Sequence, residues 1–319
     1  MPPPSSPILR SPQNPRVKAL LRLRKPRERR AAGVLLAEGR REVSRAAAAG
    51  LALRELWVRV DGGEAAGAGS GDDVGPLPAV DGPDPGAVLG IGPGWARELP
   101  ARGVAVHYAA PRVFAQLAYH QKPEGVLAVF STPRWTLEDL DPETLQQESP
   151  GGVPPLYLVA VGTEKPGNLG AMARTAAAAG CAGLVAAGPA VDVFNPNALR
   201  NSTGALFSLP TVVAEESAVR EWLQQRGVRC AAALADAGRD CFAVDWAGPE
   251  PGSGRWDPWA LVVGPEHAGL NGAWREAAAV GLTIPAAAES RGVDSLNAAN
   301  AAAVLLFDAV RRRRAARPG

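Results

Sequence analysis

The chain has 319 residues, which is enough for two domains of ordinary size, each with its own core. It lacks the roughly 18 uninterrupted apolar residues of a membrane span, and it begins without the charged and apolar regions of a secretory signal. Its net charge is +2. Its three cysteines and three histidines lack metal-ligand spacing, so we expect reduced thiols and no bound metal. Together these features predict a cytoplasmic protein without a membrane segment.

The small net charge hides an uneven distribution along the chain. Residues 1–45 contain 12 Lys and Arg against three Glu, a net charge of +9, whereas the remaining residues carry 22 basic and 29 acidic side chains, a net charge of −7. Apolar residues recur at helical spacing among the basic ones, which favours a folded basic face over a solubilising tail. A basic surface on an otherwise acidic protein indicates binding to a polyanion such as RNA. We expect eight of its residues to contact phosphate: Arg16, Lys18, Arg22, Arg24, Lys25, Arg27, Arg29 and Arg30.

The first half of the chain predicts a tail and a small α/β domain. Residues 1–13 are rich in Pro and Ser and predict a disordered tail, and residues 14–140 form the first domain. The stretch 61–86 is rich in Gly, Asp and Pro and predicts a surface insertion. We expect helices from Asn14 and over 40–49 and 111–117, and strands over 33–37, 56–60 and 125–129.

The second half alternates strands and helices after a linker over residues 141–155, which is rich in Pro, Gly, Gln and Glu. Such alternation predicts a parallel sheet covered on both faces. We expect strands over 156–161, 182–187, 210–213, 228–233, 260–263 and 281–284, and helices over 168–179, 196–201, 215–226, 268–278 and 296–314. The arginines 311–314 either complement the dipole of this last helix or contact RNA.

Three segments in this half, residues 166–176, 264–270 and 294–300, place a polar loop immediately before a helix-like run. The first follows the strand-like run 156–161, and the second follows 261–263. In an open α/β sheet, such junctions build a ligand site at the carboxyl ends of the strands.

The polar residues of these segments suit a ligand site, but each also has a plainer structural role. Asn168 and Arg174, six residues apart at a helix start, either grip a phosphate or ribose or form an ordinary turn with a surface arginine. Glu266 follows a glycine that lets a ligand approach the backbone, or it caps a helix. Ser295 and Asn297 either face a ligand or cap a buried helix. The residues alone leave these alternatives open.

In this order and near these separations, the three segments resemble the three motifs of the SpoU/TrmH class of RNA ribose 2'-O-methyltransferases, in the SPOUT superfamily. Residues 192–196 and 200–207 match the family's segment between its first two motifs, and the resemblance extends from about Asn14 to Arg314. Residues 14–140 resemble the family's small N-terminal substrate-binding domain.

The resemblance implies an α/β fold, with a parallel-sheet SPOUT domain that contains a deep trefoil knot over residues 156–319 and a smaller α/β RNA-binding domain before it. It implies a homodimer and S-adenosylmethionine as cofactor, in a pocket lined by Gly264, Ile284 and Leu296. The family's functional positions correspond here to Asn168, Arg174, Glu266, Ser295 and Asn297. Because a guanidinium normally stays protonated, we interpret Arg174 as an electrostatic clamp rather than as the general base.

The chain also departs from the family pattern. Pro265 replaces an Asn and removes a backbone donor, Ala299 replaces a Ser, and residues 286–291 lengthen the loop before Ser295 by about three residues relative to the family pattern. We predict methyl transfer to a ribose 2'-hydroxyl of structured RNA, with 23S-type ribosomal RNA favoured. A transfer RNA substrate, or a catalytically silent RNA-binding assembly factor, is the alternative.

Overall fold

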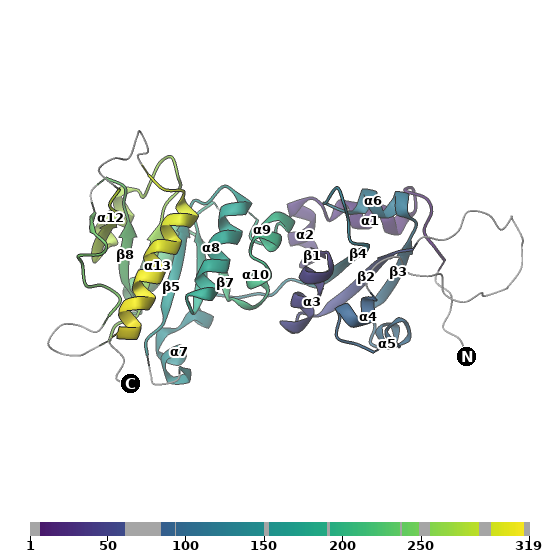
Figure 1. The fold of residues 1–319 in the computed structure, drawn as a ribbon, viewed down its shortest axis with the longest axis horizontal. Coiled ribbons are helices and arrows are strands. Elements are labelled where there is room, and N and C mark those ends of the chain that lie inside the picture. The colour runs from purple at the N-terminus through teal and green to yellow at the C-terminus, as the bar shows by residue number, and fades with distance from the viewer. Residues whose placement is uncertain are drawn as a thin grey trace, which may run out of the picture. The chain divides into compact units, whose positions relative to one another are not determined.

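A computed structural model of the chain describes residues 7–60, 84–92, 94–149, 153–189, 192–236, 238–248, 256–286 and 295–315. The chain divides into an N-terminal unit, which comprises Met1–Pro133 and Phe194–Pro196, and a C-terminal unit, which comprises Arg134–Val193 and Asn197–Gly319 (Figure 1). Within the described residues, none of the helices is both long enough and apolar enough to cross a bilayer.

The N-terminal unit is built on a four-stranded sheet of order β1-β4-β2-β3. Strand β4 runs antiparallel to β1 and β2, whereas β2 and β3 are parallel. Their bounds are β1 (Val34–Glu38), β2 (Leu53–Arg59), β3 (Ala105–Ala109) and β4 (Val126–Ser131), and the helices are α1 (Pro15–Arg22), α2 (Pro26–Ala32), α3 (Arg40–Ala48), α4 (Pro85–Val88), α5 (Trp95–Ala101) and α6 (Pro111–Leu117).

The expected elements of this unit are present, with three helices and one strand in addition. The strands predicted over 33–37, 56–60 and 125–129 and the helices predicted from Asn14 and over 40–49 and 111–117 are all found close to those bounds. Helices α2, α4 and α5 and strand β3 were not predicted. Helix α5 contains Pro100 and α2 is mostly charged, so neither carries the apolar periodicity on which the prediction depended.

The prediction of a disordered tail over residues 1–13 is wrong for residues 7–13. Residues 1–6 lie outside the described residues. Leu9 is buried and pairs in parallel with Ala109 at the edge of the sheet. Its N–H donates to Tyr108 O at 2.8 Å, and its carbonyl accepts from Ala110 N at 3.0 Å. Of the insertion expected over 61–86, residues 61–83 also lie outside the described residues, and Pro85 begins α4.

The C-terminal unit contains a seven-stranded sheet of order β7-β6-β5-β10-β8-β11-β9. Every neighbouring pair in it is parallel, which confirms the predicted parallel sheet. The strands are β5 (Leu156–Val161), β6 (Gly183–Ala187), β7 (Thr211–Ala214), β8 (Arg229–Ala233), β9 (Arg239–Asp240), β10 (Trp259–Val263) and β11 (Val280–Thr283). The two-residue β9 was too short to predict.

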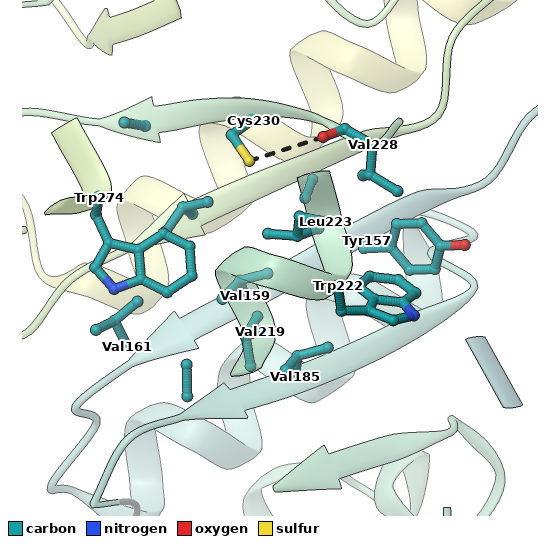
Figure 2. Packing of buried hydrophobic residues seen from close by; sticks show 14 of the residues in the cluster. Tyr157, Val159, Val161, Val185, Val219, Trp222, Leu223, Val228, Cys230 and Trp274 are labelled. Atoms are coloured by element: carbon teal, nitrogen blue, oxygen red, sulfur yellow. Dashed lines mark hydrogen bonds between the residues drawn. The ribbon is translucent and has the colours of Figure 1, made fainter. Parts of the chain in front are cut away.

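Helices pack on the sheet and join its strands. They are η1 (Glu138–Leu140), α7 (Pro142–Glu148), α8 (Pro166–Ala178), α9 (Pro196–Asn201), α10 (Ala205–Ser208), α11 (Glu216–Gln225), α12 (Gly272–Ala277) and α13 (Ala298–Ala315). Helices α8 and α13 lie side by side and contact β5 and β10 respectively (Figure 1). Val219 and Trp222 of α11 and Trp274 of α12 pack with Tyr157 and Val159 of β5 (Figure 2).

The linker expected over residues 141–155 differs from what the structure shows. Helix α7 occupies Pro142–Glu148 within it, and Asp141 caps this helix by accepting from Thr144 N at 3.0 Å. Just before it, Leu140 is fully buried, and its carbonyl accepts from the Tyr157 hydroxyl at 2.7 Å. This segment is therefore anchored to the core of the C-terminal unit; residues 150–152 lie outside the described residues.

A buried carboxylate explains part of the arginine run at the end of α13. Asp308 accepts from Trp246 Nε1 at 3.1 Å, from Arg311 Nη2 at 2.8 Å and from Arg312 Nε at 2.8 Å. Burial acts to raise the pKa of Asp308, but the hydrogen bonds and charge of Arg312 and Arg311 outweigh it and hold that pKa below its usual range. Arg311 and Arg312 therefore pair within this helix.

Candidate functional site

Three loops at the carboxyl ends of the parallel strands bring polar residues of distant sequence together. Asn168 lies in the first turn of α8, which follows β5. Glu266 lies in the turn after β10, and Asn297 immediately precedes α13. Asn168 Nδ2 donates to Glu266 Oε1 at 2.6 Å, and Asn297 Nδ2 donates to the same oxygen at 2.5 Å. Three predicted site residues therefore form one hydrogen-bonded cluster.

The second oxygen of Glu266 has a different partner. Lys165 Nζ lies 2.6 Å from Oε2, and these two groups form an ion pair. The hydrogen bond from Lys165 and then that from Asn168 hold the pKa of Glu266 below its usual range. Glu266 is therefore an ionised acceptor at neutral pH, with both oxygens engaged.

Asn297 links this cluster to the start of α13. Its Oδ1 accepts from Ala299 N at 2.9 Å, and its backbone carbonyl accepts from Ala301 N at 2.9 Å. It is thus the N-cap of the helix while its Nδ2 faces Glu266. The helix cap that the sequence offered as one alternative is present, and the same side chain also joins the cluster.

A cavity adjoins the cluster and is lined by all three residues expected at the cofactor site, Gly264, Ile284 and Leu296. Ser295 also lines it. A Cβ added to Gly264 would lie 2.7 Å from Gly269 C and 2.8 Å from Leu270 N, so only glycine lets the turn fold back this closely. The remaining lining includes Leu234, Val263, Pro265, Leu282, Ala298, Ala301 and Leu305. Apolar walls with polar groups at the rim suit a small organic ligand.

Arg174 stands apart from these residues. It lies on α8, its side chain is exposed, and the described residues give it no hydrogen bond or ion pair. The structure therefore brings together Asn168, Glu266 and Asn297, places Ser295 at the cavity, and leaves Arg174 outside the cluster within one chain.

Lys165 is the residue of this site that sequence reasoning missed. It directly precedes Pro166, the first residue of α8, and by pattern it is an ordinary surface lysine at a helix start. Its partner lies 101 residues away in the sequence. No local signal identifies such a pair.

Basic residues of the N-terminal unit form the second candidate surface. Of the eight expected to contact phosphate, Arg29 is buried, and this expectation is wrong for it. Its Nη1 donates to the carbonyls of Leu23 at 2.7 Å and Arg24 at 2.8 Å, so it fixes the connection between α1 and α2. The other seven are exposed: Arg16, Lys18, Arg22, Arg24, Lys25, Arg27 and Arg30. Arg24 also stacks over the ring of Tyr119, 4.8 Å from its centroid.

Both the N-terminal and the C-terminal part of the chain match a known family of protein domains. Residues 155–307 match the SpoU rRNA Methylase family, and residues 14–128 match the MRM3-like substrate binding domain. The chain is 35% identical over 226 residues to a 23S rRNA (uridine(2479)-2'-O)-methyltransferase of Streptomyces viridochromogenes, covering 69% of this chain and 72% of that protein.

Solved structures of RNA methyltransferases are also similar to this chain. A crystal structure of an RNA 2'-O ribose methyltransferase is similar with a TM-score of 0.69 and 34% identity, over 96% of this chain and 99% of that one. The SpoU methyltransferase AviRb from Streptomyces viridochromogenes, in complex with AdoMet, is similar with a TM-score of 0.70 and 29% identity, over 96% and 100%. An AdoMet-bound rRNA methyltransferase from Sinorhizobium meliloti has a TM-score of 0.74 and 25% identity, over 96% and 98%.

Proposed function

This chain belongs to the SpoU rRNA methylase family, and we propose that it methylates ribose 2'-hydroxyl groups of 23S-type ribosomal RNA with S-adenosylmethionine as donor. The observation that carries the proposal is the cluster of Asn168, Glu266 and Asn297 beside the cavity lined by Gly264 and Leu296. These residues come from the three segments that resemble the family's motifs.

The cavity fits S-adenosylmethionine. Its apolar lining suits the adenine ring, and Gly264 lines it without a side chain, so backbone groups there can meet a ligand. We assign cofactor binding to Gly264, Ile284 and Leu296. Bound there, the cofactor supplies an electrophilic methyl group on a sulfonium, ready for in-line displacement.

The residues of the cluster orient the acceptor and stabilise charge. Ionised Glu266 holds the amides of Asn168 and Asn297 in fixed positions, so that they and Ser295 can align a ribose hydroxyl. Arg174 acts as an electrostatic clamp that favours the alkoxide-like transition state. In this proposal it contributes positive charge and takes no proton, because its guanidinium stays protonated.

We further propose that the protein is a homodimer whose sites are completed across the interface, and that its C-terminal domain contains a trefoil knot. Both follow from the resemblance to the family. The exposed position of Arg174, away from the cluster of its own chain, supports a site that takes this residue from the partner. A cytoplasmic location follows from a ribosomal RNA substrate.

The domain assignment is part of the proposal: the N-terminal unit binds RNA, and the C-terminal unit, which includes the segment expected as a linker, carries the methyltransferase site. The seven exposed basic residues of α1, α2 and their connection deliver RNA through phosphate contacts, which supply affinity with little sequence information. Removal of residues 1–133, where the N-terminal unit ends, should abolish RNA methylation and preserve cofactor binding, as measured by methyl transfer and calorimetry.

Two measurements test the function. Ribose methylation is mapped in ribosomal and transfer RNA from cells with and without the gene; loss at a 23S rRNA ribose is expected. A change confined to transfer RNA would refute the rRNA assignment and keep the enzyme class. Calorimetry with S-adenosylmethionine should show binding, and its absence would favour the silent RNA-binding alternative, which Pro265 and the lengthened loop before Ser295 support.

A further inference from the structure

Lys165, which forms an ion pair with Glu266, has no role so far in the proposed reaction. We propose that Lys165 is a positioning residue for methyl transfer: its ammonium occupies one oxygen of Glu266, so that the other oxygen orients the amides of Asn168 and Asn297. This inference rests on the proposed function of the site.

The geometry divides the carboxylate of Glu266 between two tasks. Oε2 accepts from Lys165 Nζ at 2.6 Å, and Oε1 accepts from Asn168 Nδ2 at 2.6 Å and from Asn297 Nδ2 at 2.5 Å. A carboxylate only accepts hydrogen bonds, so both amides must turn their NH2 groups toward it. The orientation of two site amides is thereby set by one ionised group.

The opposite ends of the two amides are fixed as a result. Asn168 Oδ1 accepts from Asn297 Nδ2 at 3.3 Å, and Asn297 Oδ1 accepts from Ala299 N at 2.9 Å. If Lys165 were removed, Oε2 would become a second free acceptor, and either amide could move to it. Such a displacement near the reacting atoms costs turnover without removing a substrate contact.

Lys165 is placed to perform this task. Its backbone carbonyl accepts from Asn168 N at 3.1 Å and from Leu169 N at 3.2 Å, so its side chain starts from a fixed point at the head of α8. The side chain of Lys165 is 63% exposed, whereas that of Glu266 is 19% exposed. A hydrated ammonium therefore pairs with a largely covered carboxylate. His267, in the same turn, also lowers the pKa of Glu266.

The kinetic test compares Lys165→Met and Lys165→Arg with the wild type. Lys165→Met should lower kcat about 10- to 100-fold and leave the KM values for RNA and S-adenosylmethionine unchanged. Lys165→Arg retains a cation and should recover most of the lost turnover. The matched control is Arg134→Met, which removes a positive charge from an exposed side chain of the C-terminal unit outside the cluster; its kcat should equal that of the wild type.

The pH dependence provides a readout that a purely structural role would not change. Loss of the Lys165 hydrogen bond should raise the pKa of Glu266 toward its ordinary value, so the acid limb of the kcat profile should move to higher pH. In the absence of substrates, the Glu266 carboxyl can be titrated by carbon NMR and assigned with Glu266→Gln. Its pKa should rise in Lys165→Met and stay constant in Arg134→Met.

The possible outcomes separate this inference from the function on which it rests. An unchanged kcat with a raised KM for RNA would overturn it and make Lys165 a phosphate contact. An unchanged carboxyl titration in Lys165→Met would also overturn it, because the ion pair would then be absent in solution. If the wild type bound S-adenosylmethionine and showed the depressed pKa but methylated no RNA, the proposed function would fail, and the positioning role with it, while the ion pair would stand.

Discussion

At the scale of single residues, Asn297 makes two separate contacts, one structural and one that belongs to the proposed function. Its amide oxygen caps α13 through Ala299 N, and its amide nitrogen donates to Glu266. Either task alone would account for an asparagine at this position. The two are separable because a shorter polar side chain can perform the first and cannot reach far enough for the second.

We predict that Asn297→Ala abolishes methyl transfer and lowers the melting temperature by a few degrees, because an N-cap contributes roughly 0.5–2 kcal/mol. Asn297→Ser should recover the stability, since serine is a good N-cap, and remain inactive. Thermal unfolding and turnover of both purified variants provide the measurement. An active Asn297→Ser would show that the contact with Glu266 is dispensable.

At the scale of elements, α8 carries Asn168 and Arg174 and is held close to the segment around α9. A Cβ on Gly170 would lie 2.4 Å from Ala198 O and 2.8 Å from Asn201 Cβ. Backbone and Cβ atoms cannot move aside as the end of a long side chain can. The spacing between α8 and α9 therefore depends on this glycine.

We predict that Gly170→Ala destabilises the protein by about 1–3 kcal/mol and lowers turnover, because α8 must shift together with its site residues. The control is Gly272→Ala in α12, where nothing lies within 4 Å of an added Cβ; its stability should be unchanged or slightly increased. Urea unfolding of both variants measures the difference. Equal stability of Gly170→Ala and the wild type would contradict this packing.

The C-terminal half of α13 depends on Asp308. Because its folded pKa lies below the unfolded value, its contribution to stability is present above the unfolded pKa, near 4, and is lost as pH falls through the folded pKa. We predict that Asp308→Asn destabilises the protein by about 2–4 kcal/mol at pH 7, since Arg312 loses a buried partner. The difference from wild type should shrink as pH falls toward 3. Chemical unfolding measures the free energies of both proteins. If the difference between Asp308→Asn and the wild type did not change with pH, the ionised form of Asp308 would not be the source of its stabilising effect.

At the scale of the whole molecule, the fold keeps Arg174 out of the hydrogen-bonded cluster of its own chain. It is exposed and outside the cluster of its own chain, although it lies on the same helix as Asn168. If the proposed dimer completes the site, Arg174 of one subunit and Asn297 of the other serve the same reaction.

Mixing two inactive variants tests this arrangement. Arg174→Ala and Asn297→Ala should each be folded, bind S-adenosylmethionine and lack turnover. After dissociation and random reassociation, half of the dimers are mixed and each has one intact site, so activity should return to about a quarter of the wild-type value. No recovery would mean that both residues act within one subunit. Sedimentation of a fully active monomer would contradict the dimer itself.

Local sequence patterns determined much of this architecture. The buried strands from 156 to 161 and 259 to 263 and the helices that follow them were predictable, because apolar periodicity and turn residues act over a few neighbouring positions. The three strand-to-helix junctions made Asn168, Glu266 and Asn297 candidates for a site at one edge of the sheet. Each also had a plainer structural role, and it was the resemblance to the family that favoured the site.

Only the tertiary structure decided which distant groups meet. The strand order β7-β6-β5-β10-β8-β11-β9, the pairing of Leu9 with Ala109, the burial of Arg29 and the contact of Lys165 with Glu266 have no local pattern. Each depends on the packing of segments far apart in the chain. A lysine before a helix has the same sequence appearance whether its ammonium faces water or a carboxylate. The difference arises when β10 takes its place beside β5 and brings Glu266 within reach.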